Sequence, residues 1–124
     1  MSVSSRFLGA EVLVATLPAE PAAVPDGRLA AALTELFTVL RDRAAALPDG
    51  GGLLAMVSVP EAPVADVAVR ALIRSLAREI AARGCRVNAI LAAPDVDTSS
   101  AQAFLSSPAA IMLTGAALRA TAPG

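Results

Sequence analysis

Four residue types are absent from this 124-residue sequence: histidine, lysine, tyrosine and tryptophan. Without histidine there is no imidazole base, no serine–histidine relay and no histidine ligand for a metal. Without lysine there is neither a Schiff base nor the lysine of a phosphate-binding P-loop. Without tyrosine there is no phenolic acid or base. These absences exclude most of the common catalytic arrangements before any motif is considered.

Charge and cysteine content narrow the class of protein further. The net charge is −1 and no basic cluster is present, so we expect no nucleic-acid partner. The single cysteine, Cys85, excludes a disulfide within the chain and predicts a reducing, cytoplasmic setting. The uncharged stretch 98–118 is interrupted by polar residues and a proline, so we expect no membrane span.

Apolar residues are patterned as alternating strands and helices. Three short apolar runs are typical of buried strands: residues 11–16, 53–59 and 85–91. Two longer segments carry apolar residues at helical spacing: 26–46 and 63–83. Shorter elements are expected at 100–105 and 111–118.

This order of elements defines a fold class. Strand–helix–strand–helix–strand at such spacing builds right-handed parallel βαβ units. We therefore predict an α/β fold of about four strands and two long helices. It is half of a Rossmann-like doubly wound parallel sheet, in a single truncated domain over residues 1–124.

Several stretches resemble the short-chain dehydrogenase/reductase family. LIRSLAREIAARGCRVNAI, residues 72–90, is similar to a helix–strand segment of that family, and FLSSPAAIMLTGAALR, residues 104–119, is similar to its C-terminal segment. GGLLAMVS, residues 51–58, resembles the strand that ends in the catalytic serine. The family's first three strands, with the glycine-rich turn that takes the dinucleotide pyrophosphate, have no counterpart here.

The same resemblance implies that the family's chemistry is missing. The catalytic tyrosine and lysine fall on Ala62 and Asp66, and only Ser58 remains of the catalytic set, as a relic candidate. A serine hydroxyl orients a carbonyl but supplies neither the proton nor the hydride. We therefore expect no autonomous carbonyl reduction, no cofactor and no cofactor-binding or metal-binding residues.

The remaining chemistry-bearing residues have ordinary structural interpretations. We interpret Cys85 as a small buried filler and Asn88 as structural. Asp95 and Asp97 are expected to be turn residues rather than ligands of a hard cation. For Ser58, the alternative to a relic substrate contact is a bond to a local backbone group.

The predicted helix 63–83 carries two apolar stripes, one able to face the sheet and the other able to face another helix. In the resembling family the two long helices form the contact between subunits, which implies an oligomer surface on residues 26–46 and 63–83. The residues predicted for this surface are Leu33, Phe37, Val69, Ile73, Leu76, Ile80, Arg70 and Arg74. Alternatively, the arginines form a solvated face on which Asp66 and Arg70 pair.

The strand at 11–16 would lie next to the absent first strand of the family and so become an open edge. Native proteins rarely leave an apolar edge unpaired. We expect it to be covered by residues 1–10, by a symmetric copy or by another protein.

The leading hypothesis is a non-catalytic member of this family that works by association. It would act as a structural or regulatory subunit, as a homodimer or with a full-length short-chain dehydrogenase/reductase. One alternative is a subunit that completes the substrate pocket of a heteromeric NAD(P)-dependent oxidoreductase, lending Ser58 and the loop 92–100. Another is a small-ligand binding module.

Overall fold

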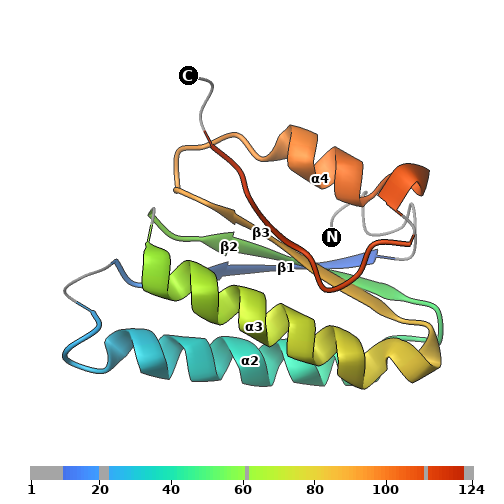
Figure 1. The fold of residues 1–124 in the computed structure, drawn as a ribbon, viewed down its shortest axis with the longest axis horizontal. Coiled ribbons are helices and arrows are strands. Elements are labelled where there is room, and N and C mark those ends of the chain that lie inside the picture. Colours follow the sequence, from blue (N-terminus) through green and yellow to red (C-terminus); the bar gives the residue numbers. More distant parts are fainter. Residues whose placement is uncertain (1–9, 20–22, 61, 111, 122–124) are drawn as a thin grey trace.

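A four-stranded, all-parallel sheet in the order β1-β2-β3-β4 forms the middle layer of the molecule (Figure 1). The computed structural model describes residues 10–19, 23–60, 62–110 and 112–121. The strands are β1 (Ala10–Thr16), β2 (Gly52–Ser58), β3 (Arg86–Ala92) and β4 (Ala117–Arg119). The helical elements are α2 (Arg28–Ala46), α3 (Pro63–Ile80), the 3₁₀ turn η1 (Ala81–Arg83), α4 (Ser99–Leu105) and the 3₁₀ turn η2 (Pro108–Ala110). The predicted α/β half-sheet with two long helices is confirmed.

The two faces of the sheet are covered unequally. α2 and α3 lie side by side against one face, and the short α4 lies over the other (Figure 1). The larger core packs side chains of α2 and α3, such as Leu40 and Ile73, against Leu53 and Val87 of the sheet. The smaller core, on the opposite face, is built by Leu54, Ile90, Leu105 and Ala110. Since parallel strands are buried on both faces, β2 and β3 are apolar along nearly their whole length.

Burial corrects half of the predicted oligomer surface. Val69, Ile73, Leu76 and Ile80 of α3 are all buried inside the chain, where they pack against the sheet. The stripe that remains outside contains Val67, Ala68, Ala71, Leu72 and Ser75. The two stripes differ in bulk, and burying the larger valine, isoleucine and leucine side chains removes more apolar area from water than burying alanine and serine.

Gly84 and Asn88 each fix a local feature of the fold. Gly84 ends the α3–η1 segment in the left-handed conformation, with φ of 68°. The buried Asn88 amide donates a hydrogen bond to the carbonyl of Leu113, at 3.0 Å, and its oxygen accepts one from the N–H of Ala116, at 3.0 Å. Asn88 therefore holds the segment that leads into β4, which confirms its structural interpretation.

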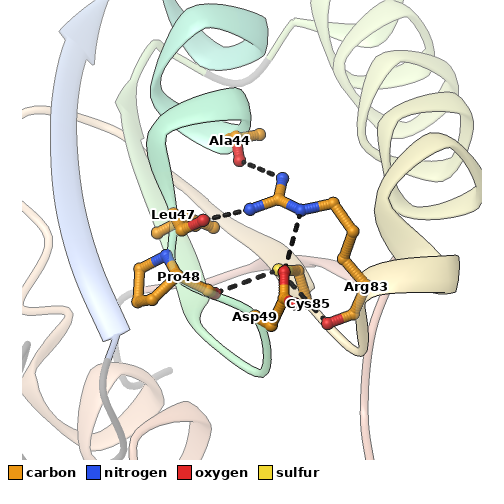
Figure 2. A network of polar contacts seen from close by, with 6 residues as sticks. All are labelled: Ala44, Leu47, Pro48, Asp49, Arg83 and Cys85. Carbon is orange, nitrogen blue, oxygen red and sulfur yellow. Dashed lines mark hydrogen bonds and ion pairs between the residues drawn. The ribbon is translucent and has the colours of Figure 1, made fainter.

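An arginine network closes the end of the molecule where α2 stops (Figure 2). Arg83 donates to the carbonyl of Ala44, at 3.1 Å, to the carbonyl of Leu47, and to the carboxylate of Asp49, at 3.3 Å. The last carbonyls of a helix have no partner within the helix, and its C-terminus favours a cation. The buried Cys85 thiol donates to Pro48 across 3.4 Å in the same cluster, as expected of a structural filler.

We predict that Arg83→Lys lowers the free energy of unfolding by about 1–2 kcal/mol, because an ammonium group cannot serve both helix carbonyls in one plane. Urea denaturation of the purified protein measures this. The matched control is Asp49→Asn, since Asp49 is 84% exposed and an exposed ion pair contributes about 0–1 kcal/mol. Equal losses in the two variants would contradict the assignment of the stabilisation to the carbonyl contacts.

Candidate functional site

A cleft of about 360 Å³ opens at the carboxyl ends of the strands, on the face that α4 covers only in part. Crevices at this edge of an open parallel sheet are the usual place for a ligand. Its walls are mainly apolar: Val12, Val14, Met56, Val57, Ile90, Ala92, Ala93, Pro94 and Val96. The polar side chains in it are Ser58, Thr98 and Gln102.

Ser58 is the last residue of β2 and lines this cleft, half-buried. Its carbonyl accepts a hydrogen bond from the N–H of Leu17, at 2.9 Å, which continues the pairing of β1 with β2. No hydrogen bond joins its hydroxyl to another side chain or backbone group of the described residues. The hydroxyl is therefore available to orient a polar group in the cleft.

The positions implied for the tyrosine and lysine carry a structural contact instead. Ala62 is completely buried immediately before α3. Asp66, in the first turn of α3, accepts hydrogen bonds from both Nε of Arg119, at 3.2 Å, and its Nη2. The third nitrogen of Arg119 donates to the carbonyl of Val59, at 2.9 Å. This pair joins β4, the start of α3 and the end of β2.

The Asp66–Arg119 pair replaces the expected Asp66–Arg70 pair, so that prediction is wrong. Arg70 instead donates to the carbonyl of Ala117 in β4. Both Asp66 and Arg119 are largely shielded, at 20% and 15% side-chain exposure, and the carboxylate also lies at the favourable end of the helix dipole. Both oxygens of the Asp66 carboxylate are therefore occupied by hydrogen bonds from Arg119.

Acidic residues near the cleft are turn residues, as expected. Asp97 accepts a hydrogen bond from the N–H of Ser99, at 2.9 Å, at the start of α4. Hydrogen bonds from Ser99 hold the pKa of Asp97 below its ordinary value. Within the described residues no group of three or more His, Cys, Asp or Glu is arranged to hold a metal ion.

Comparison with known protein families decides the relationship. Residues 13–120 match the family described as short chain dehydrogenase-like protein. The chain belongs to this family. No curated protein sequence matches it. Among the described residues, no helix is both long enough and apolar enough to cross a membrane.

Solved structures with a similar fold include BdcA and a short-chain dehydrogenase/reductase. BdcA from E. coli superposes with a TM-score of 0.67 and 22% identity, over 89% of this chain and 59% of that one. BdcA in complex with NADPH superposes with a TM-score of 0.64 and 19% identity, over 88% of this chain and 63% of that one. A short-chain dehydrogenase/reductase variant from Serratia marcescens superposes with a TM-score of 0.59 and 26% identity, over 87% of this chain and 62% of that one. The chain thus spans about three fifths of the length of these proteins.

We predict that Asp66→Lys destabilises the protein by about 2–4 kcal/mol, because it places a second cation against the shielded Arg119. Asp66→Asn keeps the shape and some hydrogen bonding, and we expect a loss of about 1–2 kcal/mol. Chemical denaturation of both variants measures the difference. A Lys variant as stable as the wild type would show that this position is not a structural ion pair.

Proposed function

We propose that this short-chain dehydrogenase-like chain is a non-catalytic structural or regulatory subunit that works by association. The observation that carries the proposal is a shallow groove of about 490 Å³ along α2 and α3. Its lining residues are Leu33, Thr34, Phe37, Ala68, Ala71, Leu72 and Ser75. They come from the sides of the two helices that the sheet does not cover.

The shape of this groove suits another pair of helices. Ala68, Ala71 and Ser75 follow one another at helical spacing on α3, and such small side chains let a second helix approach closely. Leu33, Phe37 and Leu72 are half-buried and supply apolar area at its walls. Leu33 and Phe37 therefore stay in the proposed oligomer surface, whereas the inward residues of α3 leave it.

The chemistry of the site supports a role without catalysis. Neither tyrosine nor lysine occurs in the sequence, and the two corresponding positions hold a buried alanine and an ion-paired aspartate. The partner proposed is a second copy of this chain or a full-length short-chain dehydrogenase/reductase with the same helix pair. No nucleic acid and no membrane is expected to take part, and the proposed setting is the cytoplasm.

Ala71→Arg tests this association directly. Ala71 is exposed in the groove, and arginine is a good helix former, so we expect the monomer's stability to change by no more than about 0.5 kcal/mol. Light scattering after gel filtration should show a lower mass than for the wild type. The matched control is Ala103→Arg on α4, an exposed alanine on the opposite face, whose mass should be unchanged.

A wild-type monomer that co-purifies with no relative from its native host would refute the proposal. The same result for Ala71→Arg and Ala103→Arg would place the contact elsewhere on the molecule.

The cleft beside Ser58 favours a second candidate function. In that case the chain completes the substrate pocket of a heteromeric NAD(P)-dependent oxidoreductase, or binds a small apolar molecule that carries one polar group. Native mass spectrometry of the protein purified from its host is expected to show a retained small molecule, which Ser58→Val should weaken. This candidate would be excluded by two results together. The measured mass would equal that of the chain without a ligand, and the oxidoreductase activity of the partner enzyme would be unchanged when this chain is left out of the assay.

A further inference from the structure

The strand β1 has one paired edge and one outer edge. It pairs with β2 along all seven of its residues, and no described strand lies on its other side. The N–H of Leu17 points to Ser58 of β2, so the alternation of a parallel strand directs the backbone groups of Leu13 and Ala15 toward β2 as well. Those of Val12, Val14 and Thr16 therefore point outward, where they can pair with an added strand.

Apolar hollows flank this outer edge on both faces of the sheet. On the α4 face, Val12, Val14 and Met56 belong to the cleft described above. On the α2 face, a groove of about 250 Å³ is lined by Leu13, Val14, Ala15, Thr16, Leu17, Ala32, Glu35, Leu36 and Val39. Val14 borders both and is 73% exposed. A strand added here must therefore present apolar side chains on both of its faces.

We propose that the outer edge of β1 binds β1 of a second copy of this chain, antiparallel, to form one continuous eight-stranded sheet. β1 has the required pattern itself, with Val12 and Val14 on one face and Leu13 and Ala15 on the other. Isologous pairing of one strand with its copy is the simplest closed assembly.

A two-fold axis through Leu13 lets the outward-pointing backbone N–H and C=O groups of the two copies form hydrogen bonds with each other. It pairs Val12 with the copy's Val14 and Ala10 with the copy's Thr16, so outward-pointing groups meet outward-pointing groups. Leu13 then faces its own copy as a non-hydrogen-bonded pair, the closer of the two kinds of cross-strand pair. All seven residues of β1 are used, and the four valines form one apolar cluster over the α4 face.

Charges favour the same register. α2 runs back along β1, so that Arg43 lies beside Glu11, at 3.3 Å, whereas Glu35 lies beside the other end of the strand. The axis through Leu13 therefore turns Arg43 of each copy toward Glu35 of the other. Glu35 has no ion-pair partner among the described residues. Glu11 meets the copy's uncharged Ala15, so no like charges oppose each other along the strand.

Disulfide trapping tests the register. Leu13→Cys should form a covalent dimer under mild oxidation, since only a close cross-strand pair has the geometry of a disulfide. Val14→Cys is the control, because its symmetry mate lies diagonally, and we expect it to cross-link at least about tenfold more slowly. Wild-type Cys85 is buried and should give no cross-link. Equal rates at positions 13 and 14, or no cross-link at either, would overturn the proposal.

Two edge variants test the contact without a cross-link. Val14→Pro removes an outward N–H while sparing the pairing with β2, and Val14→Lys places a charge at the seam. Both should lower the mass measured by native mass spectrometry, whereas the control Val14→Thr should not. A mass unchanged in both variants would overturn the proposal, and would mean that residues 1–9 or a different protein cover the edge.

This contact is separate from the α2–α3 groove of the proposed function, and a protein that uses both surfaces assembles into more than two chains. Ala71→Arg should therefore lower the mass without slowing the Leu13→Cys cross-link. A cross-link that forms while Ala71→Arg leaves the mass unchanged supports the edge contact and refutes the groove. A lower mass for Ala71→Arg, together with no cross-link in Leu13→Cys, refutes the edge contact and leaves the groove contact standing.

Discussion

The need to bury β2 and β3 on both faces governs this structure. Parallel strands cannot leave a face in water, because their side chains are apolar in both directions. α2 and α3 meet this need fully on one face, with a large aliphatic core. Among the residues that the structure describes, the helical elements on the other face are the seven-residue α4 and η2, and the core there is small. The open cleft near Ser58 and the exposed Val14 both result from this unequal cover.

The local elements were predictable from the sequence because each depends on neighbouring residues. The three apolar runs became β1, β2 and β3, and the two periodic segments became α2 and α3. The absence of tyrosine and lysine from the chain could be read directly from the sequence. The resemblance to short-chain dehydrogenases also held, over residues 13–120.

What could not be predicted depends on contacts between distant residues. Two apolar stripes on α3 look alike in one dimension, and only the packing showed that Val69, Ile73, Leu76 and Ile80 face inward. Asp66 has a suitable partner four residues away in Arg70, yet it binds Arg119 of β4. Arg83 has no local signal that marks its role at the end of α2. In each case tertiary packing determines the partner, because it offers a contact that is more shielded from solvent than the one between sequence neighbours.

The ion pair between Asp66 and Arg119 can form only late in the synthesis of the chain. The two residues are 53 positions apart, so the ribosome makes the carboxylate well before its cation. β1, α2 and β2 are all complete before Asp66 is added, and they can pair while α3 still lacks its anchor. During synthesis the outer edge of β1 is therefore complete before β3 and β4 have been translated.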